Sequence, residues 1–251
     1  MFDFIGKTVL VTGASRGIGA AAAKLYARHG ANVVINYKNN EDKARDVLEQ
    51  ITIDDGSARI FKADVADAGQ CKSMVDWTVS EFGGIDILVN NAGIWKESAI
   101  EDMTEEKLAE TLNSNLNGCF YCTSAAVPYM KKQRSGSIVF VSSTAGQRGE
   151  AFHSHYAASK GALISLTKSL APELAGYNIM VNCVAPGWVD TDMSHETIIS
   201  EDGSKYLSPI PLGRAAKPEE IAWPILFISS NYASFITGEI LNVNGGAVLA
   251  G

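Results

Sequence analysis

The chain has few cysteines, no excess of basic residues and no long hydrophobic run. Its 251 residues include four cysteines, with 21 Lys and Arg against 28 Asp and Glu, giving a formal net charge of −7. Scattered cysteines offer no disulfide framework for a secreted fold of this length. An acidic chain without a basic stripe is not expected to bind nucleic acid. Apolar runs fall short of the ~18 residues that span a bilayer, and no signal-peptide pattern opens the chain. We therefore expect a soluble, cytoplasmic protein that has neither membrane nor nucleic acid as a partner.

What the chain does contain is a repeated alternation of apolar, β-branched runs with helical patterns. Repeated βα units predict an α/β fold with a doubly wound parallel sheet. The length and the 46% hydrophobic content fit one domain over residues 1–251. The stretch from Thr191 to Leu212 is polar and punctuated by proline, so we expect a mobile lid or substrate loop there. The predicted strands are Thr8 to Thr12, Asn32 to Tyr37, Arg59 to Ala63, Ile85 to Asn90, Ser137 to Ser142, Asn178 to Ala185 and Ile240 to Val243.

A glycine-rich turn follows the first predicted strand. It reads Thr12-Gly-Ala-Ser-Arg-Gly-Ile-Gly19 and precedes a helix that begins near Gly17. Glycines permit a tight turn, and the backbone amides and the helix dipole attract a pyrophosphate. Similar turns also occur in βα units that bind nothing. The sequence predicts dinucleotide contacts at Gly13, Ser15, Arg16, Gly17, Ile18 and Gly19.

The end of the second predicted strand indicates which dinucleotide fits. An Asp or Glu there would favour the ribose 2′-hydroxyl of NAD, but the sequence reads Asn36-Tyr37-Lys38. Lys38 and Arg16 could instead pair with a 2′-phosphate. We therefore expect NADP(H), with NAD(H) as the alternative. The competing interpretation is that both residues are ordinary solvated surface cations.

The run from Tyr156 to Lys160 predicts the chemistry. Positions i and i+4 share a helix face, so the Lys160 ammonium can lie near the Tyr156 phenol. A fixed cation there should lower the tyrosine pKa, and a shift of ~3 units corresponds to roughly 4 kcal/mol. Ser143 ends the predicted strand that precedes this helix, at the edge where ligands bind in such sheets. A serine, a tyrosine and a lysine around one oxygen indicate redox chemistry on a carbonyl or an alcohol.

Three other interpretations remain open from the residues alone. Ser143 could be a nucleophile, although no Gly-x-Ser-x-Gly motif surrounds it. Cys119 and Cys122 have C-x-x-C spacing, but no second pair accompanies them. His153 and His155 could bind a metal, but no further ligand cluster would complete the site. We predict no metal site.

Several separated motifs together resemble the short-chain dehydrogenase/reductase family over essentially the whole chain. They are the glycine-rich turn, Asn90-Asn-Ala-Gly93, Asn115, Ser143, Tyr156-Ala-Ala-Ser-Lys160, and Pro186-Gly187 followed by Thr191. The resemblance implies a seven-stranded Rossmann sheet. It also implies that Tyr156 donates a proton to the carbonyl oxygen that Ser143 holds, that Lys160 binds the nicotinamide ribose, and that Asn115 fixes a water in a proton relay.

The same resemblance implies further contacts to the cofactor. Asp64 and Val65 correspond to the adenine-binding pair. Asn91, Ala92 and Gly93 correspond to the segment beside the ribose. Pro186, Gly187, Val189 and Thr191 correspond to the residues around the nicotinamide carboxamide.

Within the family, the chain is most similar to the 3-oxoacyl-[acyl-carrier-protein] reductases, which implies a 3-oxoacyl thioester substrate and a homotetramer. Lys131, Lys132 and Arg134 are candidates for carrier-protein docking beside the mouth of the site, although Pro172 and Tyr177 stand where arginines are expected. The polar segment from Glu150 to His155 would suit a sugar or polyol dehydrogenase instead. A non-catalytic protein that senses the cofactor is a further alternative, because a fold alone never establishes catalysis.

Overall fold

Seven parallel strands form one sheet in the computed structural model, which describes residues 2–249. The order is β3-β2-β1-β4-β5-β6-β7, and each neighbouring pair is parallel. The predicted doubly wound, seven-stranded sheet is therefore confirmed, with strand ends that differ from expectation by no more than two residues. The strands are β1 (Thr8–Val11), β2 (Asn32–Tyr37), β3 (Ser57–Lys62), β4 (Ile87–Asn90), β5 (Gly136–Val141), β6 (Ile179–Pro186) and β7 (Ile240–Val243).

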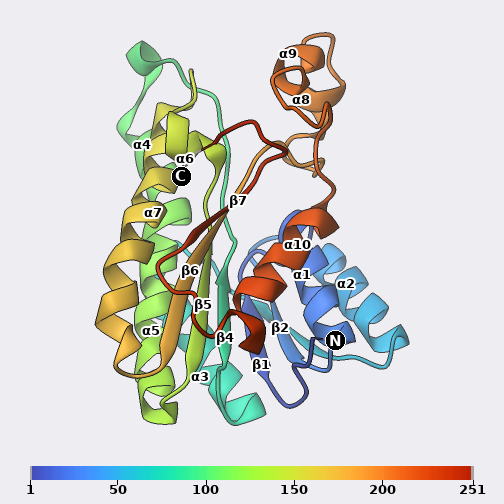
Figure 1. Cartoon of the computed structure of the whole chain (residues 1–251), viewed down its shortest axis with the longest axis vertical. Coiled ribbons are helices and arrows are strands. Elements are labelled where there is room, and N and C mark those ends of the chain that lie inside the picture. Colours follow the sequence, from blue (N-terminus) through green and yellow to red (C-terminus); the bar gives the residue numbers. More distant parts are fainter. Residues whose placement is uncertain (1, 250–251) are drawn as a thin grey trace.

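Helices cover both faces of the sheet (Figure 1). One layer holds α1 (Gly17–Arg28), α2 (Glu41–Ile53) and α10 (Pro218–Ile228). The opposite layer holds α3 (Ala68–Phe82), α5 (Gly118–Gln133) and α7 (Ser154–Ala175). The shorter elements are α4 (Glu105–Leu112), α6 (Thr144–Arg148), α8 (His195–Ile199), α9 (Gly203–Leu207), and the segments η1 (Ile100–Asp102), η2 (Asn113–Asn117) and η3 (Asn231–Ala233). Within residues 2–249, none of the helices has the length and apolar character of a membrane span.

The period of two along β1 explains why this sheet needs two helical layers. Val9 and Val11 pack in the core on the α1 side, whereas Leu10 packs in the core on the α5 side. Successive side chains of a strand point to opposite faces. A strand that is apolar at every position therefore has to be covered on both faces, as is typical of parallel sheets.

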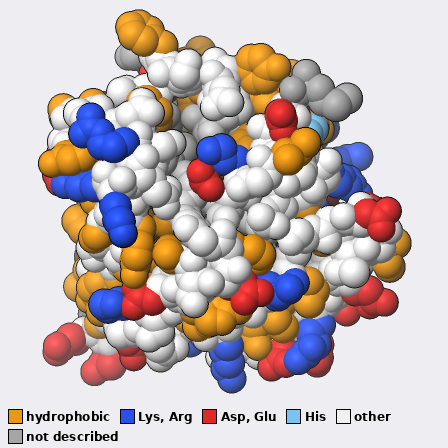
Figure 2. Space-filling model, turned by 90° about the horizontal axis from the view of Figure 1, so that it is seen from below, with side chains coloured by type: hydrophobic (Ala, Val, Ile, Leu, Met, Phe, Trp, Pro, Cys, Tyr) orange, Lys and Arg blue, Asp and Glu red, His pale blue; other side chains and the backbone are white. Residues whose placement is uncertain are grey.

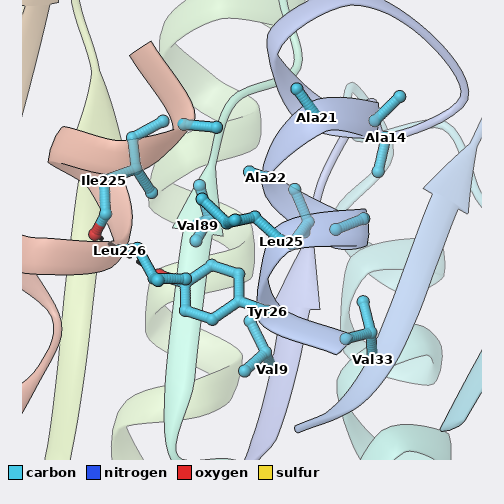
Figure 3. Packing of buried hydrophobic residues seen from close by; sticks show 14 of the residues in the cluster. Val9, Ala14, Ala21, Ala22, Leu25, Tyr26, Val33, Val89, Ile225 and Leu226 are labelled. Atoms are coloured by element: carbon cyan, nitrogen blue, oxygen red, sulfur yellow. Dashed lines mark hydrogen bonds between the residues drawn. The ribbon is translucent and has the colours of Figure 1, made fainter. Parts of the chain in front are cut away.

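Tyr26 joins α1 to α10 within the first of these cores (Figure 3). Its ring is fully buried, and its hydroxyl lies 2.6 Å from Ser229 Oγ and 3.4 Å from the carbonyl oxygen of Ile225. These contacts satisfy the buried phenol, which would otherwise lose its hydrogen bonds to water. The pair of helices that flanks the first strands is thereby fixed in place.

The sheet changes winding direction between β1 and β4, which are neighbours. The connections leaving these two strands cross to opposite faces, so a crevice opens at their carboxyl ends. The glycine-rich turn follows β1, and Asn91 to Gly93 follow β4. Both motifs therefore lie at the edge of the sheet where dinucleotides bind in this class of fold.

Residues 191–212 leave the sheet after β6 and contain α8 and α9 but no strand. Figure 1 shows these two helices beyond the carboxyl ends of the strands. The segment is anchored at its start, where Val189 forms a bridge with Ala216. It thus lies on the same side of the molecule as the crevice.

Candidate active site

The glycine-rich turn has a backbone that other residues would not adopt easily. Gly13 and Gly17 have φ angles of +62° and +55°, in the left-handed region. A Cβ atom added to Gly13 would lie 2.8 Å from Ala92 Cα, and one added to Gly19 would lie 2.5 Å from Asn91 Nδ2. Gly13 and Gly19 therefore allow the turn to pack directly against the segment that follows β4.

The first turn of α1 is arranged to receive an anion. Arg16 is the N-cap residue and its side chain makes no capping hydrogen bond. The backbone N–H groups at a helix start have no partner within the helix, and they face the positive end of its dipole. Asn36 at the end of β2 braces the turn, accepting from Gly13 N at 3.0 Å. The turn therefore fits the pyrophosphate of a dinucleotide.

Thr12 connects the two sides of the crevice. Its hydroxyl accepts from the backbone N–H groups of Asn91 and Ala92 at 3.0 and 3.1 Å. The Asn91 amide in turn donates to the Thr12 carbonyl at 2.9 Å. These bonds hold the predicted ribose-side segment directly beside the glycine-rich turn.

The segment after β6 closes the crevice from the other side. Gly187 donates its N–H to Val243 O at 3.0 Å, which aligns the end of β6 with β7. Thr191 lies against the turn, with its Cγ2 atom 3.3 Å from the position that a Gly17 Cβ would occupy. One wall of the same crevice is thus formed by the chain at and after the end of β6, which contains Pro186, Gly187, Val189 and Thr191.

Lys38 and Asp64, to which the sequence analysis gave separate roles in cofactor binding, form an ion pair. Lys38 Nζ lies 2.8 Å from Asp64 Oδ2. The other oxygen of Asp64 accepts from Ala66 N at 3.0 Å, which orders the turn after β3. Lys38, the predicted phosphate partner, therefore already has an anionic neighbour in this structure.

Val65, which follows Asp64, is buried beneath Gly118. A Cβ atom added to Gly118 would lie 2.9 Å from the Val65 carbonyl oxygen.

Ser143, Tyr156 and Lys160 come together from β5 and α7. Ser143 follows the end of β5 and caps α6, with its Oγ accepting from Ala145 N at 3.1 Å. Its hydroxyl is close enough to Tyr156 to lower the pKa of that phenol. Lys160, one turn further along α7, is buried and has its Nζ atom 5.8 Å from the centre of the Tyr156 ring. The structure thus assembles the three side chains that the spacing predicted.

The expected lowering of the Tyr156 pKa is not found. Burial raises this pKa to about 12, the nearby Ser143 hydroxyl lowers it, and the Glu150 charge raises it further. Burial also lowers the pKa of Lys160. The Lys160 ammonium is directed to Val141 O, at 2.8 Å, rather than to the phenol oxygen. Burial therefore dominates the pKa of Tyr156, and this side chain is a protonated hydrogen-bond donor at neutral pH.

Asn115 lies in the π-helical segment η2 between α4 and α5. Its side chain is fully buried, and its amide donates to Ile94 O at 2.9 Å and to Ser159 Oγ at 3.2 Å. Gly93 sits between Asn115 and Lys160, because a Cβ on Gly93 would be 3.2 Å from Asn115 Oδ1 and 3.5 Å from Lys160 Nζ. The helix is thus locally distorted at Asn115, and all four predicted catalytic residues lie in one region.

An aromatic wall, which the sequence analysis missed, consists of Trp95, His153, Trp188 and Tyr206. The Trp95 and His153 rings stack at 4.5 Å with a 6° angle between their planes. Trp188 meets Trp95 edge-on at 5.8 Å, and it contacts Tyr206 of α9 at 4.8 Å. The available signal was that both tryptophans closely follow crevice motifs, Trp95 after Gly93 and Trp188 directly after Gly187.

Glu150 contacts this aromatic wall and also acts on Tyr156, the predicted proton donor. Its Oε1 accepts from Trp95 Nε1 at 3.2 Å and lies 3.7 Å from His153 Nδ1. Burial raises the pKa of Glu150, while the nearby His153 and the Trp95 hydrogen bond lower it. The charge of Glu150 acts on Tyr156, so the carboxylate belongs to the surroundings of the proton donor.

The cysteines and histidines singled out by spacing have other surroundings. Cys119 and Cys122 belong to α5 and pack in the core, and burial raises the pKa of Cys119 to about 12. A reactive or metal-binding cysteine needs the opposite shift. His153 is stacked on Trp95, and His155 is buried with Nδ1 unpartnered among residues 2–249.

The basic residues proposed for carrier docking lie away from Ser143 in this chain. Lys131 Nζ is 4.5 Å from the ring centre of Tyr177, and the Arg134 guanidinium is 5.6 Å from it. Arg134 precedes β5 and Ser143 follows it, so the 6 residues of β5 separate them by about 20 Å. The expectation that these residues flank the mouth of the site is wrong for the single chain. Figure 2 shows the face at the amino ends of the strands, where basic and acidic side chains are interspersed.

The similarity of the chain to known proteins defines its class, an oxidoreductase that acts on CH–OH groups. Residues 13–248 match the family model described as Enoyl-(Acyl carrier protein) reductase. The chain belongs to the short-chain dehydrogenase/reductase family, whose members bind NAD(P).

Individual relatives agree with this assignment. The chain is 42% identical over 240 residues to the 3-oxoacyl-[acyl-carrier-protein] reductase FabG of Staphylococcus aureus, covering 96% of this chain and 97% of that protein. It is 43% identical over 244 residues to the FabG of Thermotoga maritima, covering 97% and 98%. A crystal structure of a short-chain dehydrogenase/reductase titled glucose/ribitol dehydrogenase, from Brucella melitensis, matches with a TM-score of 0.89 at 36% identity, covering 99% of both chains.

Proposed function

We propose that the protein reduces a ketone to a secondary alcohol with NADPH, and that its substrate is a 3-oxoacyl thioester. The observation that carries this proposal is the grouping of Ser143, Tyr156 and Lys160 beyond the end of β5, where burial raises the pKa of Tyr156. Two hydroxyls at one position suit a carbonyl oxygen that gains a proton. The thioester class is supported by the relatives at 42% and 43% identity, which are named 3-oxoacyl-[acyl-carrier-protein] reductases.

The four central residues have distinct roles in this proposal. Tyr156 gives its proton to the carbonyl oxygen, and Ser143 holds that oxygen in place. Lys160 binds the ribose of the cofactor, and Asn115 fixes a water that links Lys160 to solvent. A bound nicotinamide dinucleotide supplies the hydride. The buried amide network of Asn115 keeps this set rigid, which is what preorganised catalysis requires.

The cofactor contacts in the proposal follow the crevice. Gly13, Ser15, Arg16, Gly17, Ile18 and Gly19 hold the pyrophosphate side, and Asp64 and Val65 hold the adenine. Asn91, Ala92 and Gly93 lie beside the ribose. Pro186, Gly187, Val189 and Thr191 lie beside the nicotinamide. Lys38 and Arg16 favour NADP(H), because β2 ends without the acid that would accept from a ribose 2′-hydroxyl.

A sugar or polyol dehydrogenase is the second candidate. Glu150, with Trp95 and His153 around it, offers a carboxylate and ring faces near Tyr156. Ring faces and a carboxylate are suited to a polyhydroxylated substrate, and the Brucella melitensis structure is titled glucose/ribitol dehydrogenase. The displacement of Lys131 and Arg134 from Ser143 removes one argument for an acyl-carrier substrate within a single chain.

Three features of the whole protein complete the proposal. Residues 191–212 act as the substrate lid, since α9 contacts Trp188 through Tyr206. The protein assembles as a homotetramer, which light scattering at micromolar concentration would test, and a monomeric mass would refute it. We place it in the cytoplasm, in keeping with four free, buried cysteines.

The deciding experiment measures NADPH oxidation by the purified protein. Acetoacetyl-CoA is compared with a panel of small ketones and sugars, and each assay is repeated with NADH. Strong turnover of acetoacetyl-CoA with NADPH supports the 3-oxoacyl assignment. Turnover restricted to the other substrates keeps the reaction type and overturns that assignment.

A further inference from the structure

The cations near the carboxyl end of β2 are already paired with carboxylates. Lys38 faces Asp64 at 2.8 Å. Lys43, in the first turn of α2, donates a short hydrogen bond to Asp192, and Arg16 lies 3.7 Å from the same Asp192 oxygen. A phosphate that approached any of these cations would therefore have to displace the carboxylate that is already paired with that cation.

Asp192 comes from a different part of the fold than the cations it binds. It lies near the start of the 191–212 segment, after Thr191, which packs against Gly17. Arg16 belongs to the glycine-rich turn, and Lys43 belongs to α2. The carboxylate thus ties the proposed lid to the two elements that frame the ribose end of the crevice.

The arrangement resembles a bound anion supplied by the chain itself. Asp192 is about two-fifths exposed, and a single one of its oxygens accepts from Lys43 and forms a longer ion pair with Arg16 at 3.7 Å. Lys43 lowers the pKa of Asp192, so this group is ionised at neutral pH. A ribose 2′-phosphate carries more charge than one carboxylate and has three acceptor oxygens, so it can replace the carboxylate at the same cations.

We propose that Asp192 is an internal competitor for the 2′-phosphate of NADP(H), and that Lys43 is a phosphate-binding cation beside Arg16 and Lys38. The proposal rests on the NADP(H) preference put forward above and deepens it. When the phosphate takes Lys43 and Arg16, Asp192 loses its partners and the start of the 191–212 segment is released. NAD(H) has no 2′-phosphate and leaves this tie intact.

The test measures binding rather than turnover. Calorimetry compares adenosine 2′,5′-bisphosphate, which carries the 2′-phosphate, with AMP, which lacks it, on the full-length protein. Exposed ion pairs are weak, so Asp192→Asn should tighten adenosine 2′,5′-bisphosphate about two- to fivefold and leave AMP unchanged. Lys43→Gln should weaken the same ligand by a similar factor. Asp192→Glu keeps the anion and should behave like the wild type.

Two controls separate competition from a structural effect. Asp202→Asn removes a carboxylate that pairs with Lys205 in the same segment, and it should change neither ligand. If Asp192→Asn only loosened the 191–212 segment, NADPH and NADH would change in parallel, because both share the pyrophosphate and nicotinamide. The proposal would be overturned if Asp192→Asn changed the affinities for adenosine 2′,5′-bisphosphate and AMP equally, or changed neither.

Failure of the proposed function gives a different result. Wild-type protein that binds NADH as tightly as NADPH would refute the cofactor preference. The ratio between adenosine 2′,5′-bisphosphate and AMP in the Asp192 and Lys43 variants would still decide whether Asp192 competes with the phosphate.

Discussion

The Asn115 side chain closes a two-way hydrogen-bonded pair with the backbone of Ile94. Its Oδ1 accepts from Ile94 N at 2.8 Å, and its Nδ2 donates to Ile94 O at 2.9 Å. Ile94 directly follows Gly93 after β4, and Asn115 lies in the π-helical segment η2. The Asn115 amide therefore satisfies both backbone groups of Ile94, as a neighbouring strand would. It ties the segment after β4 to the π-helical segment η2.

Asn115→Ala should destabilise the protein. The change leaves the N–H and the carbonyl of Ile94 without their partner, at about 1–3 kcal/mol for each buried group. We expect the free energy of unfolding in urea to fall by about 2–4 kcal/mol. Asn117→Ala is the matched control, because Asn117 bonds Asn113 within the same segment. Equal losses in both variants would contradict this interpretation.

Tyr156→Phe should remove turnover and preserve cofactor binding. The phenylalanine keeps the ring but lacks the proton that the substrate oxygen needs. General acid catalysis contributes about 10²–10⁴-fold, so kcat should fall at least by that range. Fluorescence titration should give a dissociation constant for NADPH within about twofold of the wild type. Substantial remaining turnover would show that another group supplies the proton.

Glu150→Gln should lower the Tyr156 pKa and shift the pH dependence of alcohol oxidation. Burial raises this pKa to about 12, and the Glu150 charge adds to the rise. Oxidation needs the deprotonated phenol, so the rising limb of the pH–rate profile should move to lower pH in the variant. Ultraviolet difference titration of the cofactor-free protein, with Tyr156→Phe as the blank, measures the same shift.

The effect of Glu150→Gln depends on the ionisation of Glu150 in the wild type. Once Glu150 is protonated at low pH, it carries no charge and the variant should match the wild type. Glu101→Gln, on the exposed segment η1, should leave the profile unchanged. A profile that moves to higher pH in Glu150→Gln would refute the electrostatic role of this carboxylate.

Lys38→Asp should move the cofactor preference toward NAD(H). The substitution removes a phosphate partner, puts a second carboxylate beside Asp64, and offers an acceptor to a ribose hydroxyl. The ratio of NADPH to NADH affinity should fall roughly tenfold or more, since hydrogen bonds to charged groups are strong. Lys24→Asp makes the same charge change on α1, where Lys24 contacts Gln50. An unchanged ratio would mean that Lys38 is an ordinary surface charge.

The structure corrects the sequence interpretation at two places, for different reasons. The i, i+4 spacing of Tyr156 and Lys160 correctly put both side chains on one face of α7, but it could not show that Lys160 is directed to Val141 O, because that contact joins α7 to β5. The place of Arg134 could have been predicted, because the strand expected from Ser137 to Ser142 already separates Arg134 from Ser143.

The sequence by itself determined the order of strands and helices along the chain and the glycine-rich turn. These features arise from local backbone preference and from the periodicity of apolar residues, which adjacent positions encode. The resemblance to a known family, rather than periodicity, supplied most of the candidate site residues. Only the tertiary structure decided the Tyr156 pKa, the aromatic wall from Trp95 to Tyr206, and the pairing of Asp192 with Lys43. Desolvation and charge pairing depend on which side chains meet in space, and strand order and packing bring those side chains together.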